Sequence, residues 1–99
     1  MTVNLKMMMN MNMMVTMMAT AAVAVTMNVT TVGPTAGGFV TVYPSDAAVP
    51  NASNLNVRVG QGATPNSVTT ALSTGGSVSF FNKNGTVNII ADIVGYFEA

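Results

Sequence analysis

The 99-residue sequence contains no cysteine and no histidine. Without these side chains the chain cannot build the usual zinc sites, form disulfides or use a thiol as a nucleophile. It also lacks the side chain whose pKa best suits proton transfer near neutral pH. The sequence therefore predicts a protein that is not an enzyme, with no cofactor, no metal and no catalytic residue. The lack of thiols does not indicate a compartment, because such a chain survives in oxidising and reducing surroundings alike.

Charge is almost as scarce, with three basic and three acidic residues and a formal net charge of zero. These residues are Lys6, Asp46, Arg58, Lys83, Asp92 and Glu98. A nucleic-acid-binding surface needs clustered lysine and arginine, so the composition predicts no nucleic-acid partner. No polybasic segment is present that would hold the chain on an anionic membrane. The apolar content of 49% is nevertheless typical of a chain that folds.

The most unusual stretch is Met7–Met18, MMMNMNMMVTMM, which holds eight methionines in twelve residues. Lys6 before it and the small residues 19–21 after it resemble a secretory signal, but polar residues interrupt the apolar run. The run is also much shorter than the roughly 20 residues of a membrane-spanning helix, so no membrane insertion is predicted. Thioethers suit copper(I), but such sites normally include histidine or cysteine, and core packing is the favoured role.

The period of this tract distinguishes helix from strand. On a helix, Asn10 and Asn12 would lie about 200° apart and leave no clean apolar face. With a period of two, every odd position from 7 to 17 is apolar, and the even positions mix methionine with asparagine and threonine. One apolar face and one mixed face predict a β-strand that lies in a sheet and fills the core.

The rest of the chain also has the pattern of strands separated by turn residues. Alternation and short apolar runs predict strands at 21–32, 38–44, 53–60, 67–73, 77–82 and 86–97. Asn84-Gly85 predicts a hairpin, because this pair accepts the positive φ of a type I′ turn. With residues 2–5 and the methionine tract, these segments predict an all-β fold. We expect one domain over residues 1–99, a β-sandwich of about eight mostly antiparallel strands with Greek-key or jelly-roll connections, and a small barrel is the alternative.

Four segments, MNVT (27–30), PTAGGFVTVYPS (34–45), ASNLN (52–56) and ADIVGYF (91–97), resemble in order the motifs of a known repeat domain. That domain is common in secreted proteins of actinomycetes and some other bacteria, with elements that read LNVT, PTAAGFLTVYP, SNLN and DVxGYF. The resemblance covers residues 21–97 and places GQGATPNSV (60–68) at the family's glycine-asparagine loop. It implies an accessory β module, extracellular or in the cell envelope, appended to peptidases, cell-wall amidases and glycoside hydrolases. It implies no catalytic residue.

Residues 1–20 depart from this family. The family's arginine-rich LDTR segment is missing, and the methionine tract stands where a loop with glycine and proline is expected. A natural gene rarely puts methionine in place of turn residues. The departure favours an artificial origin, either a designed or a generated sequence without a selected function.

The three carboxylates do not predict a catalytic pair. A glycosidase needs two carboxylates across one cleft, whereas Asp46 is expected in a turn, Asp92 in a strand and Glu98 at the chain end. We expect Asp92 to accept hydrogen bonds from the backbone or from asparagine and threonine. One turn-rich segment offers oxygen ligands for calcium, but its single carboxylate supplies little negative charge for a divalent cation. Turn formation is the simpler explanation of these polar residues. These ligands are Asp46, Asn51, Ser53 and Asn54.

Carbohydrate binding is the most specific function that the composition allows. Sandwich modules bind sugars with exposed aromatic rings flanked by amides and hydroxyls. The candidate ligand-binding residues are Tyr43, Asn54, Asn56, Asn88 and Tyr96. The absence of tryptophan weakens this prediction, and packing is the favoured role of both tyrosines. The sequence thus predicts a non-catalytic structural module, with a polysaccharide- or cell-wall-binding module and self-association through the methionine strand as alternatives.

Overall fold

The computed structural model describes residues 2–7, 12–16 and 22–98. All regular secondary structure in these residues is β-strand, which confirms the predicted all-β class. Within the same residues, no helix has the length and apolar character needed to cross a membrane.

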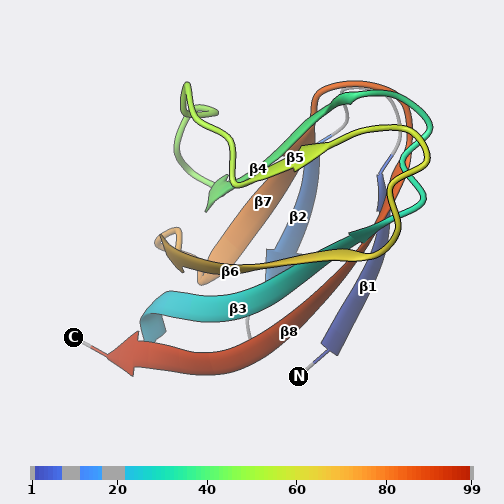
Figure 1. The fold of residues 1–99 in the computed structure, drawn as a ribbon. Helices are drawn as coiled ribbons and strands as arrows, with labels where there is room; N and C mark the ends of the chain where they lie inside the picture. The colour runs from blue at the N-terminus through green and yellow to red at the C-terminus, as the bar shows by residue number, and fades with distance from the viewer. Residues whose placement is uncertain (1, 8–11, 17–21, 99) are drawn as a thin grey trace.

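Six strands between residues 22 and 98 belong to two antiparallel sheets (Figure 1). Sheet A contains β3 (Ala22–Val32), β6 (Thr64–Ala71) and β8 (Val87–Glu98). Sheet B contains β4 (Gly38–Pro44), β5 (Leu55–Val57) and β7 (Ser77–Asn82). At the edges, β1 (Thr2–Met7) pairs with β8 and β2 (Asn12–Thr16) pairs with β7. The strand orders are therefore β1-β8-β3-β6 and β2-β7-β4-β5.

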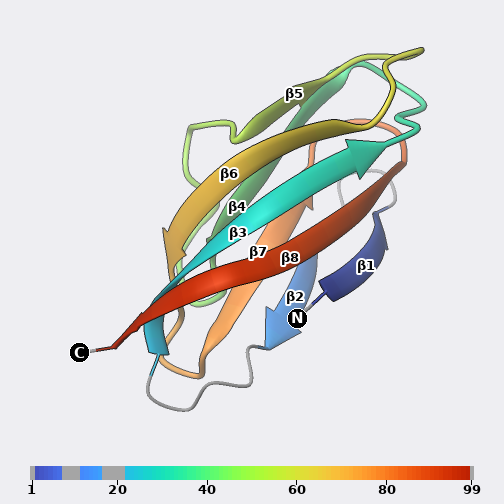
Figure 2. The same ribbon diagram turned by 60° about the horizontal axis from the view of Figure 1, so that its bottom comes forward.

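The core lies between the two sheets, which form separate layers (Figure 2). In β3 the odd residues Val25, Met27 and Val29 are almost inaccessible, whereas most even residues are half-buried on the outer face. This is the alternation expected of a strand with one inward apolar face. The other buried apolar residues of this core are Val40, Val42, Leu55, Val68, Val78, Phe80, Val87, Ile89 and Ala91.

The chain bends at Asn84-Gly85, with Gly85 at a φ of 62°, but the predicted hairpin is wrong. The flanking strands β7 and β8 lie in different sheets and pair with other strands. Each has one strongly apolar face, with Phe80 on β7 and Ile89 on β8. Because these faces meet across the core, the arrangement buries more apolar surface than a flat two-stranded hairpin would.

Two strand boundaries also differ from the prediction. The strand expected at 53–60 is limited to β5. Before it, the Asn54 Oδ1 accepts the Val42 N–H at 2.6 Å in place of a ladder bond, and after it the Gln61 N–H donates to the Arg58 carbonyl at 3.2 Å and turns the chain. β6 begins at Thr64, inside the expected loop, and continues the pairing with β3. Pro65 is tolerated there because β6 is an edge strand.

The methionine tract is divided between the two sheets. Met7 ends β1 in sheet A and residues 12–16 form β2 in sheet B, so the prediction of one continuous strand is wrong. The physical reason is that β1 and β2 pair with β8 and β7, which lie on opposite sides of the core. Residues 8–11 and 17–18 lie outside the described residues, and the inward-facing methionine row stays a prediction.

Candidate functional site

The outer face of sheet B carries an aromatic pair, Phe39 on β4 and Phe81 on β7. Phe39 precedes the buried core residue Val40, and Phe81 follows the buried core residue Phe80. Because side chains alternate between the two faces of a strand, both rings point away from the core. The ring centroids are 6.3 Å apart and the ring planes are inclined at 52°. Both side chains are half-buried and keep part of their surface accessible. A tilted pair of this kind is a favourable aromatic geometry that also presents π-surface to a ligand.

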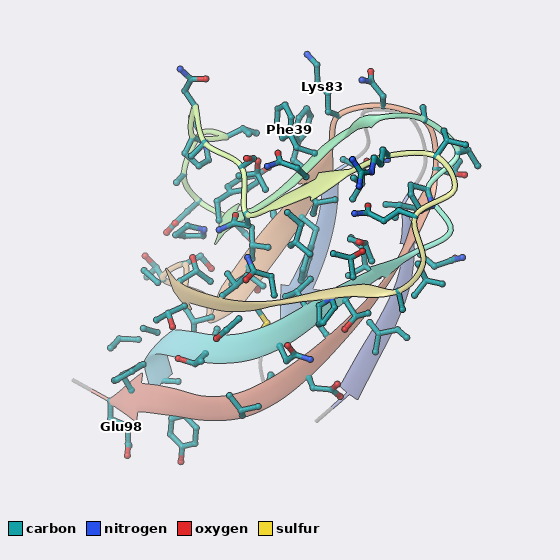
Figure 3. All side chains as sticks on the ribbon, viewed as in Figure 1. Phe39, Lys83 and Glu98 are labelled. Atoms are coloured by element: carbon teal, nitrogen blue, oxygen red, sulfur yellow. The ribbon has the colours of Figure 1, made fainter. Side chains whose placement is uncertain are left out.

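Polar side chains border the aromatic pair. Asn56 on β5 lies opposite Phe39 in the strand register and is exposed. The Asn56 Oδ1 accepts the Ser53 hydroxyl at 3.1 Å, and its amide nitrogen has no partner among the described residues. The Lys83 N–H donates to the Phe39 carbonyl at 3.0 Å, and the exposed Lys83 side chain lies on the same side of the molecule as Phe39 (Figure 3). We name Phe39, Phe81, Asn56 and Lys83 the aromatic site.

A shallow depression of about 250 Å³ adjoins the aromatic site at Asn56. Its lining residues are Asn56, Val57, Arg58 and Gln61. The Gln61 Oε1 accepts the Arg58 N–H at 3.2 Å, and the Gln61 N–H donates to the Arg58 carbonyl at 3.2 Å. This closed turn presents the exposed Arg58 side chain, whose planar guanidinium can donate several hydrogen bonds to a ligand.

The segment 45–54 covers the other half of this face. Tyr43 alternates with core residues as Phe39 does and belongs to the outer face, yet it is only 5% exposed. The neighbouring Thr41 hydroxyl donates to the Ala52 carbonyl at 2.6 Å and holds the segment against the sheet. Tyr43 is therefore a packing residue beneath this segment, which is the role that the sequence favours.

The five residues predicted to bind sugar do not form one surface. Asn56 belongs to the aromatic site, whereas Tyr43 is buried and Asn54 bonds to the β4 backbone. Asn88 is exposed on sheet A, opposite Val32 on β3. Tyr96 is 55% exposed near the end of β8. Figure 3 places Glu98, two residues beyond Tyr96, on the far side of the molecule from Phe39.

A β-bulge precedes Tyr96 on β8. Thr26 pairs with Gly95 but Met27 pairs with Ile93, so Val94 is an extra residue on β8 and is 67% exposed. Beyond the bulge, Tyr96 lies opposite Val25 near the end of β8, where Tyr96 and Phe97 are both more than half exposed.

Phe39, Phe81 and Lys83 were not predicted from the sequence as site residues. One pattern could have identified Phe81, because SVSFFN places Ser77 and Ser79 on the same face as Phe81 and thereby marks that face as the outer one. No such pattern marks Phe39, since GFVTVYP has large apolar residues on both faces.

The three carboxylates occupy three separate places. Asp92 is half-buried on sheet A, opposite Asn28, and Glu98 ends β8. The Asp46 Oδ2 accepts the Thr74 N–H at 3.0 Å and the Thr74 hydroxyl at 3.1 Å. The backbone bond from Thr74, followed by the hydroxyl bond, lowers the pKa of Asp46 below its ordinary value. Asp46 thus ties the connection after β4 to the turn before β7.

Asp46→Asn is expected to flatten the pH dependence of stability in the acidic range. Because the folded-state pKa of Asp46 is lowered, its carboxylate stabilises the fold above the pKa of the unfolded chain, and this contribution is lost as the pH falls through the folded-state pKa. Thermal unfolding between about pH 7 and about pH 2 should show a slightly larger loss of stability in the wild type than in the variant. Parallel losses in the two proteins would contradict the expectation.

The oxygen atoms considered for calcium serve separate partners. Asp46 accepts from Thr74, and Asn54 accepts from Val42. In the described part of the chain, no group of three or more histidine, cysteine, aspartate or glutamate residues is arranged to hold a metal ion. Asp46 and Asn54 form these hydrogen bonds with distant segments of the chain, and only the Ser53 hydroxyl bonds locally, to the Asn56 Oδ1.

The aromatic site is an open surface on which ligands can stack and form hydrogen bonds. It offers two partly accessible rings, the free amide nitrogen of Asn56 and the Lys83 ammonium, with Arg58 beside it. This chemistry suits a ligand with apolar ring faces and many hydroxyl groups. The chain itself matches no protein-family model, no curated protein and no solved structure.

Proposed function

We propose that the chain is a non-catalytic accessory module that binds a glycan chain at the aromatic site. The observation that carries this proposal is the Phe39–Phe81 pair, with its 6.3 Å centroid separation on a sheet face that is only half covered. Leaving part of two large rings in water forgoes hydrophobic stabilisation, which the apolar face of a sugar would restore. The resemblance to modules of secreted bacterial proteins supports a place outside the cell or in the cell envelope.

The proposed scaffold is an eight-stranded jelly-roll sandwich. Its support is the nesting of the strand pairs β1–β8, β2–β7, β3–β6 and β4–β5, which are all antiparallel. A single long hairpin with these pairs, rolled into two layers, gives the orders β1-β8-β3-β6 and β2-β7-β4-β5. Because such scaffolds host many unrelated functions, the glycan proposal depends on the aromatic site and not on the fold.

The geometry favours a soluble glycan chain over a crystalline surface. Two rings inclined at 52° cannot both lie flat on one crystal face. A chain whose successive sugar rings turn relative to one another can contact both. Lys83 and Arg58 add positive charge beside the rings, which favours cell-wall glycan with carboxylate-bearing peptide stems.

Phe39→Ala and Phe81→Ala are each expected to weaken glycan binding by at least about tenfold, since each removes one stacking surface. Calorimetric titration with soluble peptidoglycan fragments, chitin oligosaccharides and cellulose oligosaccharides measures the affinity. Tyr96→Ala is the matched control, because it removes an exposed ring from the far end of β8 and should leave binding unchanged.

Two results would count against the proposal. One is the absence of binding to all three soluble glycans, together with no retention on insoluble peptidoglycan, chitin or cellulose. The other is a loss of affinity in Tyr96→Ala equal to that in Phe39→Ala. Circular dichroism of each variant establishes that a loss of binding does not come from unfolding.

A further inference from the structure

β6 is an edge strand of sheet A, and half of its backbone groups point away from β3. The Leu72 N–H donates to the Val23 carbonyl at 2.9 Å, which makes these two residues a hydrogen-bonded pair. Such pairs alternate with non-hydrogen-bonded pairs along an antiparallel ladder, so the even residues of β6 bond to β3. The residues that direct their backbone groups to the free edge are Pro65, Ser67, Thr69 and Ala71.

Two independent features agree with this assignment. Thr26 and Thr69 face each other with their hydroxyl oxygens 2.9 Å apart, as expected in a non-hydrogen-bonded pair, where side chains are closest. Pro65 has no N–H, and it falls in the outward set, where β3 loses no hydrogen bond. All four outward residues are exposed, so the free edge of β6 is accessible.

This edge has little of the protection that natural edge strands carry. Lysine, inward charges and bulges usually prevent such strands from pairing with another chain. No charged residue lies between Arg58 and Lys83, and the pairing of β6 with β3 is regular. Only Pro65, near one end, interrupts the row of donors. β6 has eight residues, against three in β5 at the corresponding edge of sheet B.

We propose that two copies of the chain associate by antiparallel pairing of β6 with β6 across a two-fold axis. In the assigned register, Ser67 lies opposite Thr69 of the second copy, and Pro65 lies opposite Ala71 of the second copy. Each Ser67–Thr69 pair exchanges two hydrogen bonds, and each Ala71 N–H donates to a Pro65 carbonyl. The interface therefore contains about six backbone hydrogen bonds.

The register is self-complementary, which favours a second copy over an unrelated extended peptide. Pro65 has no N–H to donate to the Ala71 carbonyl of the second copy. That carbonyl does not need the bond, because it already accepts the Thr70 hydroxyl of its own chain at 3.2 Å. No backbone group between Pro65 and Ala71 is then left without a partner. A two-fold interface uses the same segment twice, and this uncharged segment brings no like charges together.

The pairing joins two copies of sheet A into one continuous sheet and leaves sheet B of each copy uncovered. Each dimer would present two aromatic sites, which raises the avidity for a polymer with repeated units. Self-association through the methionine strand is one of the alternatives that the sequence predicts, whereas the free backbone groups of β6 favour association at this other edge. Association through β6 does not depend on glycan binding, and either proposal can fail without the other.

Sedimentation equilibrium from low micromolar to millimolar concentration is expected to show a monomer–dimer equilibrium in the wild type. Ser67→Pro removes the outward N–H from both copies and should raise the Kd by about 10- to 100-fold. The Ser67 N–H makes no bond to β3, so the variant should keep its strand signal in circular dichroism. Ser67→Ala is the matched control, because it keeps the N–H and should dimerise like the wild type.

Cysteine cross-linking tests the register and does not need the proline variant to fold. The sequence has no cysteine, so thiols introduced by substitution form no disulfides with other residues of the chain. Ser67→Cys mixed with a tagged Thr69→Cys should form a disulfide-linked pair on mild oxidation, whereas Ala48→Cys mixed with the same partner should not. A monomer at every concentration, undiminished association of folded Ser67→Pro, or cross-linking no faster than in the control would overturn the proposal.

Discussion

Phe80→Ala is expected to lower the free energy of unfolding by about 3–5 kcal/mol. Phe80 is fully buried on the inner face of β7, opposite Val42 of β4. Among the described residues, it has the largest of the fully buried side chains. The backbone ladders fix the strands on both sides, so the core cannot close around the missing ring. For a domain of this size the loss corresponds to a fall in Tm of roughly 15 °C or more.

Phe81→Ala is the internal control for this prediction, because it deletes the same side chain one residue further along the strand. Phe81 lies on the outer face and is half-buried, so its removal should cost only about 1 kcal/mol. Urea unfolding followed by circular dichroism measures both variants. Equal losses would mean that the two rings do not occupy opposite faces of β7, and the assignment of the aromatic site would fail with them.

The strands of the core could be predicted because each has an unmixed apolar face. Val25, Met27 and Val29 alternate with threonine and asparagine, which determines both the strand and its inward side. The partner of each strand could not be predicted in the same way. Asn84-Gly85 is a local hairpin signal, and it was overridden because β7 and β8 bury more apolar surface by facing each other across the core than by pairing.

The candidate site was harder to predict than the fold, and β4 shows why. GFVTVYP has large apolar residues on both faces, because one face packs in the core and the other carries Phe39 and Tyr43. A period of two cannot tell these faces apart. Which ring stays accessible depends on the segment 45–54, which covers Tyr43 and leaves Phe39 half-exposed. That contact is tertiary and has no local sequence signature.

Asn54 shows how a polar residue that suits a ligand can instead be used by the fold. Its Oδ1 accepts the Val42 N–H at 2.6 Å, and its own N–H donates to the Val40 carbonyl at 2.9 Å. The Asn66 amide then donates to the Asn54 carbonyl at 2.7 Å and links β6 to this point. Asn54 therefore supplies hydrogen-bond partners to backbone groups of β4 that β5 is too short to reach. This role explains why an asparagine stands at this position of the SNLN segment.

Gly85→Ala is expected to destabilise the protein by at least about 3 kcal/mol, against about 1 kcal/mol for Gly33→Ala. Both glycines have a φ of 62°, so both variants bear the strain of a left-handed residue with a Cβ atom. At Gly33 the added Cβ would meet nothing within 4 Å. At Gly85 it would lie 2.6 Å from the Thr35 Oγ1 and 2.9 Å from the Ala36 Cβ.

The surroundings of Gly85 cannot move aside without breaking other bonds. The Thr35 hydroxyl accepts the Thr86 N–H at 2.8 Å, and the Thr35 N–H donates to the Thr86 carbonyl at 3.0 Å. The Gly85 carbonyl also accepts the amide of the fully buried Asn82 at 2.9 Å. Thermal unfolding of the two variants isolates the steric cost, because the strain at φ is common to both. Equal Tm values would show that the connection between β7 and β8 accommodates the added Cβ atom without steric cost. The hydrogen bonds between Thr35 and Thr86 could then no longer explain why the chain crosses from sheet B to sheet A at this point.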